Sequence, residues 1–206
     1  MPFIDLVTDD EAHGEAAEML ATIRAAGDVP NHARLFALRP DVHRAWREML
    51  GAITKHMDSR RYELVTLAAA KALGSSYCML AHGRILLDGH YDAATLRGIV
   101  ADHRSAGLDA VDVAVMDLAA AVATDAASVT REDVDRLLGL GLTQAEVFDV
   151  VLAAAARCFF SSTLDGLGVL ADAAYAGLEP GLRDDLTVGR PIAPSGTSAW
   201  RRPEAG

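Results

Sequence analysis

The chain has 206 residues, 51% hydrophobic but only 5% aromatic, and a formal net charge of −10. This length supports one self-sufficient core, and the negative charge argues against nucleic acid and anionic membrane surfaces as partners, because both require a basic surface. Two cysteines are too few for a secreted disulfide framework, so we expect a reducing, cytoplasmic environment.

Capping residues, glycines and prolines divide the chain into a succession of helices. Alanine and leucine dominate the apolar positions, and both are strong helix formers. Thr8 and Thr143 each begin a capping box, and Asp58 is placed to cap the helix that carries Glu63. The expected helices span residues 8–26, 32–38, 41–54, 59–73, 76–89, 92–100, 110–123, 131–139 and 144–175. No convincing alternating strand pattern is present, so the prediction is an all-α, single-domain protein.

We expect neither a signal peptide at the N-terminus nor a membrane-spanning segment. The first residues lack the basic flank and apolar run of a signal peptide, and the longest uncharged stretch, residues 72–83, is too short to span a membrane. We expect a helical domain over residues 1–186 and an extended arm over residues 187–206, where prolines, serines and glycines accumulate. Trp200 would anchor the arm if it docks; a disordered tail is the alternative.

One short segment places a thiol next to a base. Cys78 and His82 are four residues apart near the start of an expected helix, so they share one face of that helix. Glu63, on the preceding expected helix, is placed to orient the imidazole. A thiol, a base and an orienting carboxylate are the components of an activated cysteine site. The helix N-terminus and a neighbouring imidazolium would both favour the thiolate.

The spacing from Glu63 to His82 resembles the active-site motif of the alkylhydroperoxidase D and carboxymuconolactone decarboxylase superfamily, Glu-x11-Cys-x-x-Cys-x3-His. Glu63, Cys78 and His82 match this motif, as does Tyr77 before the cysteine. Ser75 stands where the family has its first cysteine. Further segments resemble the peroxidase-related branch, among them Val29-Pro30-Asn31 and Leu167-Gly168-Val169, so the likeness runs from about residue 29 to 169.

The resemblance implies an alkylhydroperoxidase D-like helical bundle and a role for each motif residue. In the two-cysteine relatives the cysteine nearer the histidine attacks, the other resolves the sulfenic acid into a disulfide, and the glutamate belongs to a proton relay with the histidine. A serine cannot form that disulfide, so Ser75 would act as a hydrogen-bonding group, a proton relay or only a helix N-cap. A sulfenate on Cys78 would need an external thiol, or Cys158 if the fold brings it near.

Each of these residues also has an ordinary structural interpretation. Cys78 could be a buried core thiol, His82 a histidine bonded to a carbonyl, and Glu63 part of a solvated charged face. Cys158 lies in an apolar helix, where core packing is the better interpretation. A zinc site built from Cys78, His82 and a carboxylate lacks the paired ligands of known zinc motifs, so we expect no metal and no cofactor. The six other histidines are expected to be surface or packing residues.

The leading hypothesis is a thiol-dependent, peroxidase-like oxidoreductase that acts on a hydroperoxide, with Cys78 attacking, His82 as base and Glu63 orienting it. A lyase or isomerase like carboxymuconolactone decarboxylase, acting on a small organic acid or lactone, and a redox-inactive homologue remain as alternatives. The pH dependence of Cys78 alkylation would separate these classes. Relatives form trimers or hexamers, which implies a homotrimer or homohexamer here.

Overall fold

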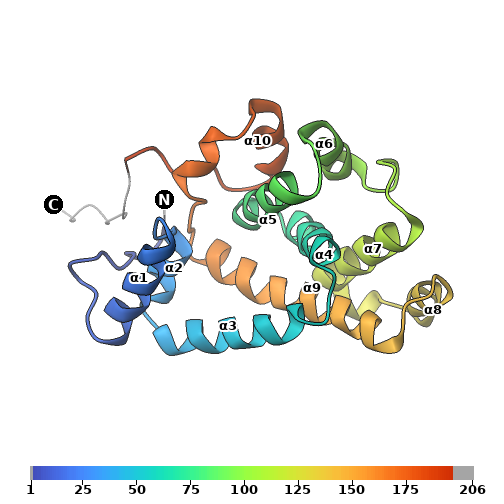
Figure 1. Ribbon diagram of the computed structural model, residues 1–206, viewed down its shortest axis with the longest axis horizontal. Coiled ribbons are helices and arrows are strands. Elements are labelled where there is room, and N and C mark those ends of the chain that lie inside the picture. Colours follow the sequence, from blue (N-terminus) through green and yellow to red (C-terminus); the bar gives the residue numbers. More distant parts are fainter. Residues whose placement is uncertain (1, 197–206) are drawn as a thin grey trace.

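The computed structural model describes residues 2–196, and these residues fold as helices joined by short connections (Figure 1). The expected all-α class is therefore confirmed for the part of the chain that is described. The α-helices are α1 (Glu15–Ala26), α2 (Asn31–Phe36), α3 (Pro40–Thr54), α4 (Ser59–Ala72), α5 (Ser76–Gly89), α6 (Ala93–Asp102), α7 (Ala110–Asp125), α8 (Arg131–Gly139), α9 (Gln144–Gly166) and α10 (Pro180–Leu186). Two 3₁₀ turns, η1 (Ala126–Ser128) and η2 (Ala173–Gly177), complete the set.

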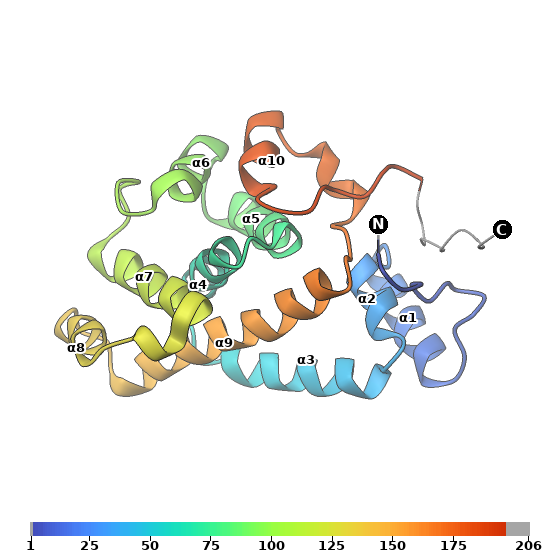
Figure 2. The ribbon, with the colours of Figure 1, turned by 180° about the vertical axis from the view of Figure 1, so that it is seen from behind.

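Helix α4 is the centre of the molecule. It packs most extensively against α5, α7 and α9, and Figures 1 and 2 show it enclosed from both sides. Every residue from Tyr62 to Ala70 is buried. A helix buried on all sides needs no polar face, and the alanines at positions 68–70 allow neighbouring helices to approach closely. Glu63 is the one acidic or basic residue between Tyr62 and Ala70.

Helix α9 is the longest element and crosses the molecule beneath α4 and α5 (Figure 1). By length and composition alone α9 could cross a membrane, but half of its most apolar window is buried within the described structure. It packs against α3, α4 and α7, and it carries the buried Arg157. These contacts are those of a core helix in a folded domain.

Most expected helices are found within a few residues of their predicted ends. Asp58 caps α4 by accepting a hydrogen bond from the Arg61 amide, and α5 begins at Ser76 as predicted. Complete capping boxes open α8 at Thr130 and α9 at Thr143. Local sequence therefore determines these boundaries, because each cap satisfies amides that the helix itself leaves unpaired.

Two predicted helices are wrong in extent. The Thr8 amide does bond to Glu11, but this contact closes only a turn, and α1 begins later, after Gly14. The helix predicted to run to about residue 175 ends at Gly166, because Gly168 adopts a positive φ of 69° that turns the chain away. Helix α10 was not predicted.

The start of the predicted arm is docked on the domain. Ile192 forms an isolated parallel bridge with Ala171, and the Gly189 amide donates to Ser76 Oγ over 2.7 Å. A Cβ at Gly189 would lie 2.1 Å from the Gly74 carbonyl oxygen, so only glycine permits this close approach. The segment therefore lies across the first turn of α5. Trp200, the proposed anchor, lies outside the described residues.

Candidate active site

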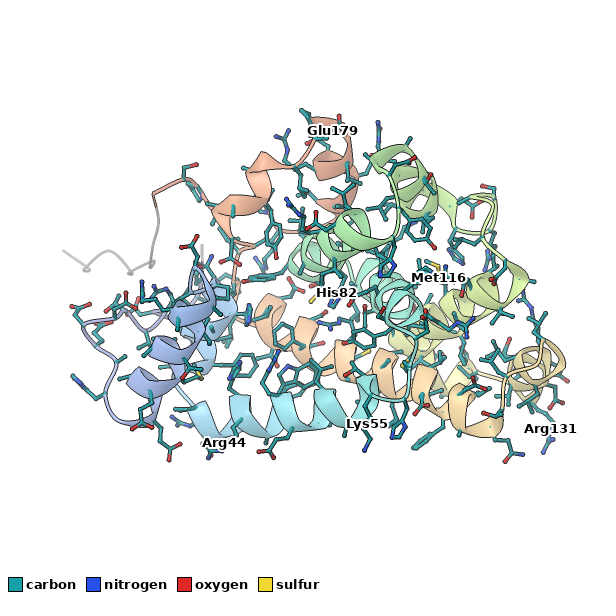
Figure 3. The ribbon with its side chains drawn as sticks, in the orientation of Figure 1. Arg44, Lys55, His82, Met116, Arg131 and Glu179 are labelled. Carbon is teal, nitrogen blue, oxygen red and sulfur yellow. The ribbon has the colours of Figure 1, made fainter. Side chains whose placement is uncertain are left out.

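The turn between α4 and α5 brings the predicted motif together. Helix α4 ends at Ala72, and Gly74 takes a positive φ of 66° that lets the chain reverse into α5. Glu63 and His82 then face each other across the two helices, each only 8% exposed. Figure 3 shows His82 in the interior of the molecule, among α4, α5 and α9.

The imidazole of His82 is held by a carboxylate. Its Nδ1 lies 2.5 Å from Glu63 Oε2, which agrees with the predicted proximity of the two side chains. A carboxylate can only accept, so Nδ1 carries the proton and Nε2 is left as the acceptor. Burial lowers the pKa of His82, the nearby Arg157 lowers it further, and Glu63 offsets this only in part. The ring is therefore neutral at pH 7.

The Cys78 thiol is almost completely buried, with 1% of the residue exposed. Its sulfur contacts two donors from α9: Ser161 Oγ at 3.1 Å and Arg157 Nη1 at 3.4 Å. The expected imidazolium beside the thiol is not found, because burial lowers the pKa of His82 and leaves its ring neutral. The cation that touches the sulfur is a guanidinium.

Arg157 is a residue of the candidate site that the sequence interpretation missed. It is 4% exposed, its Nη2 lies 3.5 Å from the Tyr62 hydroxyl, and its guanidinium lies over the Phe160 ring. Burial by itself would lower the pKa of Arg157, but the neighbouring Cys78 and Tyr62 raise it above its usual value. A signal was present in the sequence: Arg157 shares the helix face of Val150, Ala153, Ala154, Ser161 and Leu164, all of them buried.

Ser75 lies at the N-cap position of α5, but its side chain does not cap the helix. The residue is fully buried, and its hydroxyl forms no hydrogen bond of normal geometry within the described structure. The Asp165 carboxyl responds to this hydroxyl: burial raises the pKa of Asp165, and Ser75 partly offsets this. The structure thus supports neither a capping role nor a contact between Ser75 and the thiol.

Cys158 does not take part in the cluster around Cys78. It is partly exposed rather than a core residue, and burial raises the pKa of its thiol. It follows Arg157 directly on α9, so its side chain points about 100° away from the face that meets Cys78. Cys158 is accordingly a poor partner for an intramolecular disulfide.

One histidine that was expected to be a surface or packing residue belongs to a buried network. The His32 backbone amide and ring Nδ1 lie 3.2 and 3.1 Å from the Tyr77 hydroxyl, which in turn donates to Asp172 Oδ2. Burial lowers the pKa of His32 to about 4. This network ties α2 and the chain after α9 to the residue next to Cys78. Within residues 2–196, no group of three or more His, Cys, Asp or Glu side chains is arranged to hold a metal ion.

A comparison with known protein families finds a similarity over the segment that carries this arrangement. The profile of the carboxymuconolactone decarboxylase family matches residues 40–101, which include the whole motif from Glu63 to His82. No curated protein sequence matches the chain significantly.

Solved structures share the fold. An uncharacterised peroxidase-related protein from Silicibacter sp. TM1040 superposes with a TM-score of 0.76 at 19% identity, over 85% of this chain and 94% of the other. The alkylhydroperoxidase AhpD core protein from Ralstonia eutropha JMP134, also peroxidase-related, gives 0.69 at 21%, over 82% and 88%. The debrominase Bmp8 without ligand gives 0.72 at 16%, over 89% and 97%. The motif-bearing segment, residues 40–101, is thus similar to the carboxymuconolactone decarboxylase family, and the chain shares its helical fold with alkylhydroperoxidase D-like proteins.

Proposed function

We propose that this protein is a thiol-dependent oxidoreductase that reduces hydroperoxides through Cys78. The observation that carries the proposal is the position of Cys78 on the same helix as His82, one turn before an imidazole that Glu63 holds in its neutral form. A neutral imidazole with a free Nε2 can accept a proton at neutral pH. Cys78 is almost completely buried, which strengthens electrostatic interactions at the sulfur.

In the proposed reaction the Cys78 sulfur attacks the outer oxygen of the hydroperoxide. An S–O bond forms while the O–O bond breaks, which yields a sulfenic acid and an alcohol, and His82 transfers the proton while Glu63 orients the ring. Because Ser75 cannot form a disulfide and Cys158 points away, two equivalents of an external thiol return Cys78 to its reduced form. The cytoplasm, rich in small thiols, is the compartment that suits this cycle.

Two proteins of similar fold support the proposed peroxide reduction, and a third favours a second candidate function. The names of the Silicibacter and Ralstonia proteins describe them as peroxidase-related. The debrominase Bmp8, which also shares the fold, has been solved with 2,3,4-tribromopyrrole as a variant in which a cysteine is replaced by alanine. The second candidate is therefore dehalogenation, in which a thiolate takes the halogen from an aromatic ring. A lyase acting through His82 and Glu63 alone is the third class.

The experiment is mass spectrometry and turnover in the presence of a hydroperoxide. The wild type is expected to gain one oxygen atom on Cys78 and to consume peroxide only with added thiol. Cys78→Ser should abolish both, while the matched control Cys158→Ser should leave both unchanged. Peroxide consumption that persists in Cys78→Ser, or a wild type whose Cys78 is never oxidised, would reject the proposal. Thiol-dependent release of bromide from a brominated pyrrole would instead identify the second candidate.

We also propose that the protein works as a homotrimer or homohexamer. Large apolar side chains are exposed on two adjoining helices, Val42 and Met49 on α3 and Phe148 and Phe159 on α9. Apolar exposure of this kind is typical of a surface that another subunit covers. Light scattering at micromolar concentration should give an oligomer mass, and a monomer mass would contradict this proposal.

A further inference from the structure

A cavity of about 590 Å³ lies between α1 and α3, apart from the candidate active site. Figure 1 shows these two helices together with α2 at one end of the molecule. Met19 and Ile23 of α1 give the cavity an apolar wall, while His32 and Arg47 supply polar groups. An apolar cavity of this size with a few converging polar groups is the usual form of a small-molecule site. Its lining includes none of the motif residues, so the proposed function leaves this cavity unexplained.

His32 offers a free hydrogen-bond acceptor to this cavity. Its Nδ1 lies 3.1 Å from the Tyr77 hydroxyl, which donates its own proton to Asp172, so Nδ1 carries the proton of the ring. The pKa of about 4 keeps the ring neutral at pH 7, and Nε2 is therefore an acceptor. Within residues 2–196 no group donates to Nε2, although this atom is not sealed off from solvent. A ligand in the cavity that His32 lines can reach this atom with a hydroxyl group.

Arg47 places an unpaired positive charge on the α3 wall of the cavity. Within the described residues it forms no ion pair, whereas its neighbour Arg44 is paired with Glu15 at 3.1 Å. Burial lowers the pKa values of His32 and His43, and the charge of Arg47 lowers them further, so the guanidinium is near both rings. Two neutral rings leave this charge without a counter-ion, and the group that pairs best with a guanidinium is a carboxylate.

The opposite wall restricts where an anion can bind. Glu18 of α1 lines the same cavity, and its carboxylate forms no ion pair within residues 2–196. A negative charge next to Glu18 is disfavoured, so a ligand should carry a single negative charge and place it on the α3 side. We propose that the cavity binds a hydroxylated monocarboxylic acid whose carboxylate pairs with Arg47, whose hydroxyl donates to His32 Nε2 and whose apolar body packs against α1. This binding is independent of the reaction proposed for Cys78.

The test is isothermal titration calorimetry of the full chain at pH 7 with three matched probes. Phloretate carries a phenol hydroxyl and a carboxylate, hydrocinnamate lacks the hydroxyl, and para-propylphenol lacks the carboxylate. Phloretate should bind with a millimolar or lower dissociation constant, and each of the other two should bind about tenfold more weakly, because each loses one hydrogen-bonded contact. This comparison uses the wild type alone. If phloretate does not bind, or binds no better than para-propylphenol, the proposal is overturned.

Substitutions with opposite expected effects locate the site. Arg47→Met should weaken phloretate binding about tenfold and spare para-propylphenol, whereas Glu18→Gln should strengthen phloretate binding by removing a like charge. His32→Asn keeps a donor for the Tyr77 hydroxyl but has no atom at the position of Nε2, so phloretate and hydrocinnamate should bind this variant equally.

The matched control is Arg131→Met, which removes the same charge at the other end of the molecule from Arg44 and the cavity (Figure 3). It should leave the affinity for phloretate unchanged. Equal weakening by Arg47→Met and Arg131→Met, or weaker binding of phloretate to Glu18→Gln, would place the anion elsewhere and overturn the proposal.

Discussion

The cluster around Asp112 and the cluster around Cys78 both contain arginine, and they differ in the acidic group that the arginine contacts. Between α4 and α7, the carboxylate of Asp112 is 1% exposed and is paired with Arg60 and Arg61. Both of these arginine side chains remain more than a quarter exposed to solvent. At the candidate site the positions are reversed: the arginine is enclosed, and a weak acid, Cys78, is in contact with it.

The difference separates a structural ion pair from a contact with the proposed nucleophile. The Asp112 carboxylate on α7 pairs with two arginines of α4 and so holds these two helices together. The Arg157 guanidinium instead contacts a thiol and a phenol hydroxyl, at the residue that we propose to react.

Acid pH should produce the largest change in stability. Burial keeps an imidazole in its neutral form, so the protonation that acid pH forces on the ring disfavours the folded state. The pKa of His32 is about 4 in the folded protein, against 6.5 as its ordinary value. The unfolded chain binds this proton first, so stability should fall as the pH decreases from about 6.5 to about 4, by at most about 3 kcal/mol. Urea unfolding across this range measures the slope, and His32→Gln should flatten it. If stability falls with pH as steeply in His32→Gln as in the wild type, other groups cause the acid sensitivity.

Breaking the structural pair should cost less and leave the chemistry intact. Asp112→Asn removes the counter-charge of Arg60 and Arg61, but these arginines can recover water, so the expected loss is about 2 kcal/mol in urea unfolding. The rate of Cys78 alkylation per folded molecule should not change. If Asp112→Asn retains full stability, or if its Cys78 is alkylated at a different rate, the two clusters do not have the separate roles described here.

Restoring the missing cysteine should give the smallest effect, a modest gain. Ser75→Cys places a second thiol three residues before Cys78, within the separation of about 7 Å between Cα atoms that a disulfide tolerates. Dithiol-dependent peroxide turnover should then increase severalfold over wild type, because resolution becomes intramolecular. Mass spectrometry of the oxidised variant checks that the disulfide forms. If the disulfide forms without a gain in turnover, while Cys78→Ser retains a native lyase activity, the lyase class replaces the redox proposal.

Sequence reasoning reached the part of the site that local periodicity determines. The four-residue spacing of Cys78 and His82, and the capped helix that carries Glu63, follow from rules that act within one or two helices. The partner that touches the sulfur could not be paired with it in this way, because contacts between distant helices depend on the packing angles of the whole bundle. The sequence shows that Arg157 is an arginine on an otherwise apolar face of α9. It does not show that this arginine contacts the Cys78 sulfur.

The same reasoning explains the errors in the fold. The capping box at Thr143 predicted the start of α9 well. The end of α9 depends on Gly168, whose positive φ turns the chain without any break in the apolar pattern of the sequence. At Thr8 the backbone amide bonds to Glu11, as in a capping box, but no helix begins there. Side-chain contacts that satisfy a few amides occur in turns as well as in helices, and the residues that follow decide between them.

The separation of Cys78 and Arg157 in the chain also affects how the protein is made. During synthesis Cys78 emerges from the ribosome 79 residues ahead of Arg157, and α5 can form before α9 exists. Until α9 packs, the sulfur has neither its guanidinium nor its cover. The surroundings of Cys78 are therefore completed only when the chain has folded, and a nascent or truncated chain that ends before α9 lacks both donors to the sulfur.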